Sequence, residues 1–481
     1  MSEQREVRAQ KVEALRVSGT MPWPDRFRRS HSTAEARGLP AGTTGVTVAG
    51  RLRLIRVMGK LLFAHLQDAA GQLQILVRRE AVGEGSFEML KKLVDLGDFL
   101  GATGSMMVTK TGEITLEARG VTFLGKALRP LPEKWHGLTD LELCYRQRYL
   151  DLVMSPETRE RFGLRVEVIR QIRRMLEERG FTEVETPVLM TTPSGALARP
   201  FVTHHHALDI PLYLRIAPET YLKRLIVGGY ERVYEFARCF RNEGMDPSHL
   251  QDFTMLEYYV AYWSYEENME FTEELLKTVL TGVYGSLETA RQRTGVDWSG
   301  EWPRVPLSDL IEREAGIRLA DFPDAPALRD EVARRGLGIE DAAKLGRGSL
   351  VDQIYKKLCR PKLVSPVFLV RHPIDLSPLA RRSDDDPSVA DRFQLVVKGW
   401  EVVNAYSELV DPVDQRKRLE DQARLRQGGD AEAMEMDEDY LLAMEHGMPP
   451  ISGWGMGIDR FVALLSNAAN LRDVVFFPTM R

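Results

Sequence analysis

A polar, charged loop between two apolar runs contains the first residues whose types suggest chemistry. Residues 236–262 read FARCFRNEGMDPSHLQDFTMLEYYVAY, and the aromatic and apolar runs at both ends predict the two strands of a hairpin. Arg241 ends the first predicted strand, and Glu257 and Tyr259 share one face of the second. The forked donors of arginine suit phosphate or carboxylate, and Phe253 could stack on a planar base. This face therefore suits a ligand with both anionic and cationic groups, and ordinary paired surface charge is the alternative.

Two carboxylates seven positions apart form a second candidate site. In the segment GWEVVNAYSELVDPVDQR, Glu401 and Glu408 lie among apolar residues. On a straight strand they would face opposite sides, whereas a bend would let both reach one Mg²⁺, a hard cation that prefers oxygen ligands. Solvated surface charge is the alternative for this pair.

A glycine-rich turn forms the third candidate. The segment GWGMGIDRFVALL places three glycines immediately before an amphipathic helical pattern. Glycine lets the backbone approach a ligand closely, and Arg460 lies in the first turn of the predicted helix, where anions are favoured. By itself, such a turn is weak evidence for a binding site.

Length and composition limit the kind of protein that positions these residues. A chain of 481 residues with 43% hydrophobic and 28% charged residues predicts two or three globular domains. The net charge of -5 does not indicate nucleic-acid binding, although an acidic protein can carry a local basic face. Its three cysteines lack metal-ligand spacing and predict buried thiols in a reducing compartment. Without an apolar run of about 18 residues or a signal-peptide pattern, the chain is expected in the cytoplasm.

Hydrophobic patterning divides the chain into segments. Residues 1–44 predict a short surface helix and a linker rich in proline and arginine. Residues 45–128 show strands, one helix and further strands, which is the order of a five-stranded OB-fold barrel. Residues 129–150 predict a hinge. The remainder, 151–481, mixes strands with helices, and its more polar stretch near 285–345 predicts an insertion.

Three segments, taken in chain order, resemble motifs 1, 2 and 3 of the class II aminoacyl-tRNA synthetases: GFTEVETPVL, FRNEG…FTMLE and GMGIDRFVALL. An OB-like domain before that core resembles the subgroup that charges lysine, aspartate or asparagine. Strings such as YRQRYLDL, RIAPETYLKRLIVGG and HPIDLSPLARR are similar to lysyl-tRNA synthetases of the bacterial type. The resemblance runs from about residue 45 to the C-terminus, apart from the predicted insertion. It implies an α+β fold, with an N-terminal OB-fold β-barrel and a class II catalytic domain whose antiparallel sheet is flanked by helices.

The resemblance assigns ATP binding to the hairpin, the carboxylate pair and the glycine-rich turn. Arg241 would bind both the α-phosphate of ATP and the amino-acid carboxylate, and Arg241 and Arg460 would be the catalytic residues. Phe253 and Arg460 would pack on opposite sides of the adenine ring, and Glu401 and Glu408 would hold Mg²⁺. The implied ATP-binding residues are Arg241, Glu243, His249, Phe253, Glu401 and Arg460.

The resemblance also assigns a lysine pocket and an anticodon surface. Carboxylates suit a lysine side chain because a buried ammonium needs paired oxygens. Val410 departs from the family pattern, which has asparagine there, and this leaves Arg241 as the main partner of the lysine carboxylate. The implied lysine-binding residues are Gly195 and Glu219 for the α-amino group, Arg241 for the carboxylate, and Glu257, Tyr259 and Asp414 for the side chain. The implied anticodon-binding residues are Phe63, Gln74 and Glu113.

The implied reaction is the two-step charging of tRNA(Lys) with lysine and ATP, by a homodimer that pairs through motif 1 and has no membrane partner. An aspartyl or asparaginyl enzyme shares the fold but needs a cationic pocket, and Glu257 and Asp414 argue against it. A truncated relative that attaches lysine to a protein factor would lack the barrel. A tRNA-binding protein that has lost catalysis is the alternative from a different class. ATP–pyrophosphate exchange with each amino acid would distinguish these interpretations.

Overall fold

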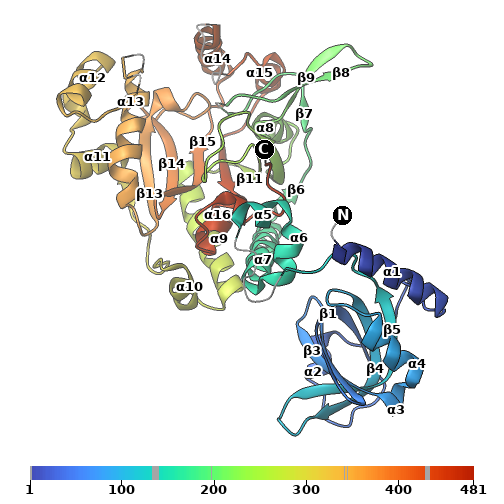
Figure 1. Cartoon of the computed structure of the whole chain (residues 1–481). Helices are drawn as coiled ribbons and strands as arrows, with labels where there is room; N and C mark the ends of the chain where they lie inside the picture. The colour runs from blue at the N-terminus through green and yellow to red at the C-terminus, as the bar shows by residue number, and fades with distance from the viewer. Residues whose placement is uncertain are drawn as a thin grey trace. The chain divides into compact units, whose positions relative to one another are not determined.

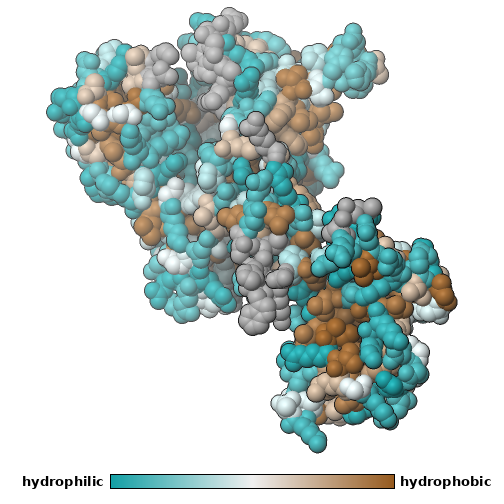
Figure 2. Space-filling view, in the orientation of Figure 1, coloured by the Kyte–Doolittle hydropathy of each residue, from teal (hydrophilic) through white to brown (hydrophobic). Residues whose placement is uncertain are grey.

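The chain forms two compact units in the computed structural model, Met1–Thr139 and Asp140–Arg481 (Figure 1). Their division falls inside the predicted hinge 129–150, of which residues 133–139 lie outside the described part of the chain. Apolar side chains gather on the visible face of the first unit, whereas polar ones cover most of the second (Figure 2). No helix among the described residues is long and apolar enough to cross a membrane. The structure describes residues 3–132, 140–196, 198–340, 342–343, 345–427 and 434–480.

The first unit contains a closed five-stranded barrel with the strand order β1-β2-β3-β5-β4. In β2 every second residue from Leu62 to Leu66 is buried inside the barrel, whereas Phe63 and His65 are partly exposed outside. The predicted OB-fold order of strands, helix and strands is confirmed. The elements are β1 (Val46–Met58), β2 (Leu61–Gln67), β3 (Gln72–Arg78), α3 (Arg79–Val82), α4 (Glu84–Lys92), β4 (Phe99–Val108) and β5 (Ile114–Gly125).

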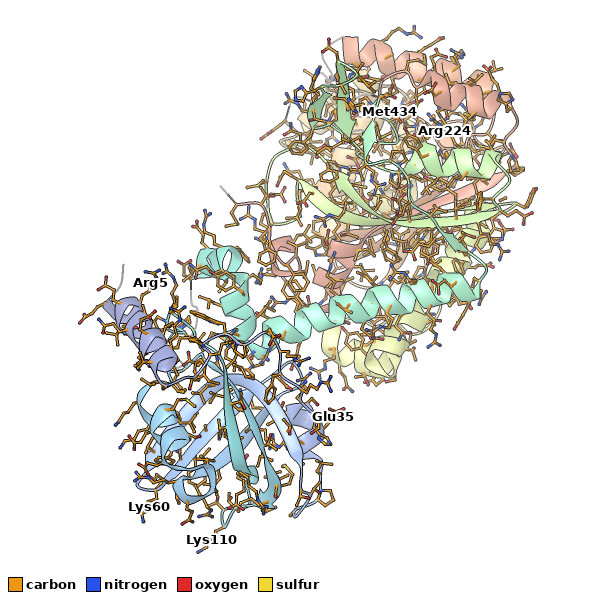
Figure 3. The ribbon with its side chains drawn as sticks, turned by 90° about the vertical axis from the view of Figure 1, so that its right-hand side faces the viewer. Arg5, Glu35, Lys60, Lys110, Arg224 and Met434 are labelled. Atoms are coloured by element: carbon orange, nitrogen blue, oxygen red, sulfur yellow. The ribbon has the colours of Figure 1, made fainter. Side chains whose placement is uncertain are left out.

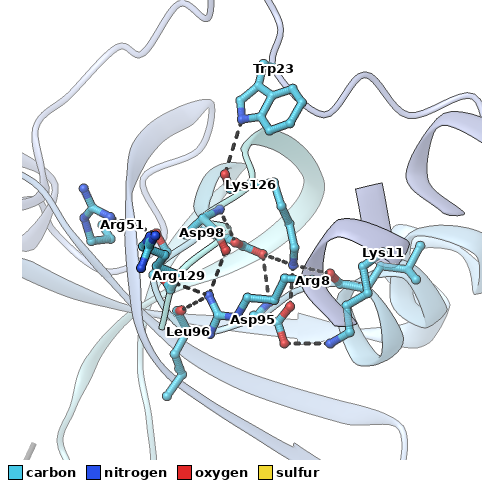
Figure 4. Close-up of polar contacts among 12 residues, drawn as sticks. Arg8, Lys11, Trp23, Arg51, Asp95, Leu96, Asp98, Lys126 and Arg129 are labelled. Atoms are coloured by element: carbon cyan, nitrogen blue, oxygen red, sulfur yellow. Dashed lines mark hydrogen bonds and ion pairs between the residues drawn. The ribbon is translucent and has the colours of Figure 1, made fainter. Parts of the chain in front are cut away.

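The N-terminal helix α1 (Glu3–Val17) packs on this barrel. Its Leu15 is buried in the barrel core, as is part of the short helix α2 (Thr33–Arg37). The Arg8 side chain bonds to segments that flank the end of β5 (Figure 4). It donates to the backbone carbonyls of Leu96 at 3.2 Å, Ala127 at 2.8 Å and Arg129 at 3.3 Å. These bonds hold α1 where the chain leaves the barrel.

The second unit is built on an eight-stranded sheet with the order β12-β13-β14-β15-β16-β11-β10-β6. The inner pairs from β13 to β10 are antiparallel, and the two outermost pairs are parallel. The sheet strands are β6 (Thr182–Glu183), β10 (Arg232–Phe240), β11 (Asp252–Ala261), β12 (Arg304–Pro306), β13 (Val367–Pro373), β14 (Val389–Val397), β15 (Trp400–Ser407) and β16 (Ile451–Gly457). A smaller sheet contains β7 (Leu189–Met190), β8 (Val202–His205) and β9 (Ile210–Leu214).

The two faces of the large sheet have different roles. On β11, Leu256, Tyr258 and Val260 belong to a core that also includes apolar residues of α7, α9 and α16. The alternate residues of β11 therefore lie on the opposite face. The predicted antiparallel sheet flanked by helices is confirmed. The helices are α5 (Leu141–Arg146), α6 (Arg148–Met154), α7 (Pro156–Glu178), α8 (Glu219–Val227), α9 (Tyr265–Tyr284), α10 (Leu287–Thr294), α11 (Leu307–Ala315), α12 (Ala325–Arg334), α13 (Arg347–Ile354), α14 (Pro412–Gln427), α15 (Glu438–Glu445) and α16 (Ile458–Leu465).

The stretch predicted as an insertion, 285–345, is only partly separate from this sheet. Trp298 and Trp302 are buried in the core beside the sheet, and β12 pairs with β13 at its edge. Helices α11, α12 and α13 instead surround a second apolar cluster that includes Leu310 and Leu328. Most polar residues of the stretch are exposed, and their number makes the stretch look separate in the sequence although it contributes two tryptophans to the core.

Candidate active site

A cavity of about 310 Å³ lies on the sheet face opposite that core. Three neighbouring strands, β15, β16 and β11, supply its base. Every second residue of β11 lines it because strand side chains alternate between the two faces. Met434, labelled in Figure 3, lines it from the segment before α15. The lining residues of β11 are Phe253, Met255, Glu257 and Tyr259.

The glycines of β16 make room for the cavity. Gly453, Gly455 and Gly457 line it in alternation, so the middle strand presents backbone instead of side chains. A Cβ atom at Gly453 would overlap the Glu408 carboxylate and come within 2.5 Å of the Tyr259 ring. At Gly455 the nearest atom would be 3.6 Å away, which is ordinary contact. Gly453 is therefore the position where a side chain is sterically excluded.

One end of the cavity is basic. Arg241 follows β10, and its Cζ lies 5.0 Å from the centroid of the Phe253 ring. Its Nε is buried and has no hydrogen-bond partner among the described residues. Arg460 lines the cavity from the first turn of α16, where burial lowers the pKa of its guanidinium and the charge of Glu401 opposes this shift. A buried donor without an acceptor is costly, so this end is suited to an anionic ligand.

The other end of the cavity is acidic. Glu219, Glu257 and Glu408 are each at least 94% buried there. Glu219 Oε1 accepts from the Tyr406 hydroxyl at 2.8 Å and from the Lys223 ammonium at 2.7 Å. Burial, followed by the charge of Glu219, raises the pKa of Glu257 well above its usual value. Three buried carboxylates with a single lysine partner favour a ligand that brings further positive charge.

Glu401 and Glu408 both line the cavity, but they have different neighbours. Between them, β15 pairs with β16 from Val403 to Ser407. Glu408 forms an ion pair with Lys223, and burial raises its pKa although that pair opposes the shift. Glu401 therefore lies with the arginines and Glu408 beside Lys223, and their assignment to one Mg²⁺ stays a prediction.

A β-bulge explains why Glu401 reaches the cavity. Val403 pairs with Leu395, but Glu401 pairs with the next residue, Val396. The extra residue in β15 reverses the alternation, so Glu401 lines the cavity together with the even-numbered Asn404.

The loop of the hairpin carries Glu243 and His249 at the mouth of the cavity, where both are exposed. His249 Nδ1 lies 2.8 Å from a carboxylate oxygen of Asp246. Although burial opposes the shift, hydrogen bonds from Ser248 and His249 lower the pKa of Asp246 to about 2. Hydrogen bonds among its own polar groups therefore hold the loop together, while its side chains that line the cavity remain accessible.

Of the predicted lysine-binding residues, Gly195 lines the cavity and Asp414 does not. Gly195 lines the cavity with a φ of +91°, and a Cβ there would come within 3.2 Å of the Glu219 Cβ. Asp414 is not among the lining residues; its carboxylate accepts from the Arg418 guanidinium at 2.6 Å within α14. Asp414 thus lies outside the cavity lining, and its assignment to the lysine side chain stays a prediction. Val410 packs against an apolar cluster beside α8 and is likewise not a lining residue.

Four residues that line or adjoin the cavity have no role assigned from the sequence: Arg392, Asn404, Tyr406 and Lys223. Arg392 Nε donates to Asn404 Oδ1 at 2.8 Å, which fixes the amide beside the basic end. Asn404, Tyr406 and Glu408 alternate, and this two-residue period is the signal that could have placed them on one face. Lys223 lies four residues after Glu219, which is the helical spacing for an ion pair.

The predicted anticodon residues lie on one outer face of the barrel. Phe63 on β2 is partly exposed, and its strand neighbour His65 pairs with Gln74 on β3. Thr115 on β5 pairs with Gln74 in turn, and Glu113 precedes it by two residues at the tip of the β4–β5 hairpin. Strands 2 and 3 of an OB-fold are its usual oligonucleotide-binding face.

Comparison with known proteins agrees with this architecture. Residues 140–481 match the family described as tRNA synthetases class II (D, K and N), and residues 46–124 match the OB-fold nucleic acid binding domain. A lysine–tRNA ligase of Pelotomaculum thermopropionicum is 46% identical, over 100% of this chain and 95% of that protein. A lysine–tRNA ligase of Enterococcus faecalis is 44% identical, over 100% and 98% respectively. With its barrel, its sheet and its full-length relatives, this chain belongs to the class II tRNA synthetases of the D, K and N group.

Proposed function

We propose that the protein is a lysine–tRNA ligase, which activates L-lysine with ATP and transfers it to the 3′ end of tRNA(Lys). The observation that carries this proposal is the charge pattern of the cavity. Two arginines stand at one end and three buried carboxylates at the other. Lysine with ATP presents the complementary pattern. Among the described residues, the acidic end has no cation for the side chain of aspartate except the paired Lys223.

The basic end would bind ATP and perform the chemistry. The lysine carboxylate attacks the α-phosphorus, the bond to the β-phosphate oxygen breaks, and pyrophosphate leaves. In the second step the terminal ribose hydroxyl of tRNA attacks the activated carbonyl, and AMP leaves. Arg241 and Arg460 would stabilise charge on the phosphate and hold the adenylate, with Phe253 under the base. Glu243 and His249 are positioned to contact the nucleotide from the loop.

Glu401 fits a role in holding Mg²⁺. Magnesium in nucleotide sites commonly takes one or two carboxylates together with substrate phosphates, and Glu401 is the carboxylate beside the arginines. When bound, the ion would neutralise phosphate charge. Glu408, which also lines the cavity, is proposed as the second carboxylate ligand.

The acidic end would bind the amino acid. Glu219 and the backbone at Gly195 are assigned to the α-ammonium, and Arg241 to the carboxylate. Glu257 and Tyr259, which line this end from β11, are assigned to the side-chain ammonium. An amino acid whose side chain is shorter, or lacks an ammonium, would leave a buried carboxylate unpaired. The cost of burying that unpaired charge would reject it.

The direct test is ATP–pyrophosphate exchange on the purified protein with each amino acid in turn. We expect exchange with lysine and none above background with aspartate or asparagine. Exchange driven by another amino acid would reassign the pocket. No exchange with any of them, together with retained tRNA binding, would point to a binding protein without catalysis.

Gly453→Ala should weaken lysine use by about 100-fold in kcat/KM. The added methyl would displace the Glu408 carboxylate and the Tyr259 ring, and a misplacement of about 1 Å in an active site can cost about 100-fold. Gly455→Ala is the matched control, since its Cβ has room, and should fall less than Gly453→Ala does. Equal losses in the two variants would contradict the steric argument.

The barrel face is proposed as the anticodon-binding surface, with Phe63 as its stacking platform. Phe63→Ala should raise the KM for tRNA about tenfold, because stacking on a base contributes ~1–3 kcal/mol. Pyrophosphate exchange should not change, since it needs no tRNA. Phe99→Ala, which removes another partly exposed phenylalanine of the barrel, is the control. Loss of exchange in Phe63→Ala would show that the substitution acts on the other unit or on folding.

Three further assignments complete the proposal. Residues 45–128 form the anticodon-binding domain and 151–481 the catalytic domain, joined by the hinge. The enzyme works in the cytoplasm as a homodimer that pairs near Pro187. Sedimentation equilibrium on the purified chain tests the dimer: a single species with the mass of one chain, at concentrations where the enzyme is active, would exclude it.

A further inference from the structure

The two side chains proposed to contact the adenine ring, Phe253 and Arg460, lie beyond the end of a strand ladder. Strands β11 and β16 pair only as far as Met255 and Gly457. Phe253 is two residues past that end on β11, and Arg460 is three residues past it, in the first turn of α16. The ladder itself therefore does not fix the distance between these two side chains.

One buried carboxylate connects the two chains past the end of the ladder. Asp459 precedes Arg460, and its Oδ2 accepts from the backbone N–H of Thr254, the residue after Phe253, at 2.8 Å. A single side chain thus joins the neighbour of one ring-contacting residue to the neighbour of the other. This bond sets the width of the space between Phe253 and Arg460, which we call the adenine slot.

The cation that pairs with Asp459 comes from α7, outside the cavity lining. Arg165 Nη1 lies 2.5 Å from Asp459 Oδ1, and its Nη2 donates to the hydroxyl of Thr254 at 3.0 Å. Nη1 also donates to the backbone carbonyl of Val474 at 3.4 Å. One oxygen of Asp459 thus faces Arg165 while the other faces Thr254. Without the guanidinium, the carboxylate would be a buried charge with no cation to hold its direction.

We propose that Arg165 is a positioning residue for the nucleotide, which acts through Asp459 to set the width of the adenine slot. It holds the Asp459 carboxylate in the direction from which the carboxylate accepts from Thr254. Stacking contacts depend steeply on separation, and a gap of ~0.5–1 Å forfeits a quarter to a half of the dispersion attraction. Arg165 itself touches neither ATP nor lysine. This inference rests on the proposed lysine–tRNA ligase activity.

The first test is the steady-state kinetics of Arg165→Met in pyrophosphate exchange. We expect the KM for ATP to rise about tenfold while the KM for lysine stays within about twofold, because the acidic end is untouched. Arg165→Lys keeps the cation without the fork, so its KM for ATP should lie between those of the wild type and Arg165→Met. Arg174→Met is the matched control: Arg174 lies on the same helix but pairs with Glu178 at the surface, at 2.9 Å. Its two KM values should equal those of the wild type.

The second readout is the binding of adenosine, which carries the base without the phosphates and needs no catalysis. Its dissociation constant, measured by isothermal titration calorimetry, should rise about tenfold in Arg165→Met. The dissociation constant of lysine should stay within about twofold. A general structural defect would weaken both ligands together, so the separation of the two constants distinguishes a role in the adenine slot from a role in folding alone.

A second pair of variants keeps the test decisive if Arg165→Met does not fold. Asp459→Asn needs no cation, so Arg165→Met/Asp459→Asn leaves no unpaired buried charge. If Arg165 acts through Asp459, the two variants should bind adenosine equally, within about twofold, and both about tenfold more weakly than the wild type.

Two results would overturn the inference: adenosine binding at the wild-type level in a folded Arg165→Met or in Asp459→Asn, or a further tenfold loss in the double variant relative to Asp459→Asn. A wild-type protein that binds adenosine but shows no lysine-dependent exchange would instead overturn the proposed function.

Discussion

Arg241→Ala should reduce lysine-dependent pyrophosphate exchange by about a thousandfold in kcat, equivalent to ~4 kcal/mol of transition-state stabilisation. Arg241 is the lining residue whose buried Nε has no partner in the described part of the chain, so its donors are available to the phosphate and carboxylate oxygens. Those oxygens carry more charge in the transition state than in the ground state. The loss should therefore appear mainly in kcat, with smaller changes in the two KM values.

Arg238→Ala is the control for this variant. Arg238 lies three residues earlier, on β10, but it is half-exposed and pairs with Asp252 at the surface, so its loss should leave exchange within about twofold. Arg241→Lys should recover only part of the activity, because an ammonium lacks the planar fork. If Arg241→Ala exchanged pyrophosphate at a rate close to the wild type, the basic end would not be where the α-phosphate reacts.

Glu257→Gln should lower kcat/KM for lysine at least a hundredfold while raising the thermal stability of the free enzyme. The amide keeps the shape of the side chain but removes the charge that pairs with the substrate ammonium. In the free enzyme that charge is destabilising, because burial and the neighbouring Glu219 raise the pKa of Glu257 well above its usual value. Active-site groups commonly carry such a conflict between stability and function.

The sign of the stability effect follows from proton linkage. A carboxyl group whose pKa is higher in the folded state binds a proton more tightly there, so it favours folding at low pH and loses this contribution as pH rises. The loss begins near the unfolded value of about 4.3 and is complete above the raised folded pKa. Glutamine behaves as the permanently protonated form, so the difference in melting temperature should grow across that window.

Melting curves between pH 4 and 9 and exchange kinetics at neutral pH test both halves of this prediction. Lysine should raise the melting temperature of the wild type and not that of Glu257→Gln. Asp252→Asn, on the same strand but paired with Arg238 at the surface, is the control for a change from acid to amide. A variant that was less stable than the wild type at neutral pH, and still used lysine normally, would remove Glu257 from the site.

Much of this architecture follows from local pattern. The alternation of apolar residues around Phe63 predicts which face of β2 enters the barrel, and the structure has the same alternation. The hairpin around Arg241 and the glycines before α16 likewise form the strands and the turn that their sequence indicates. Strand period, turn residues and helix starts depend on neighbouring residues, so a single sequence contains enough information for them.

The positions of the acidic residues could not be predicted from the sequence. Glu401 and Glu408 carry the same chemistry in the sequence, but a bulge opposite Val396 brings the first to the arginines, and straight pairing with β16 carries the second to the acidic end. Asp414 is acidic and close in sequence, yet the helix that contains it pairs it with Arg418. For Glu401 a bulge in the β14–β15 hairpin decides where the side chain points, and for Glu408 a pairing partner far away in the sequence does, whereas Asp414 pairs within its own helix.

The sequence by itself therefore determined the class of fold, the family and the hairpin that forms the basic end, because these depend on periodicity and on motifs contiguous in the chain. Only the tertiary structure decided how charge is distributed within the cavity. Lys223 comes from a helix and Glu408 follows a strand 185 residues later, and they form an ion pair only because α8 packs beside β11 and β16. Side chains that meet through packing leave no spacing in the sequence by which their contact can be predicted.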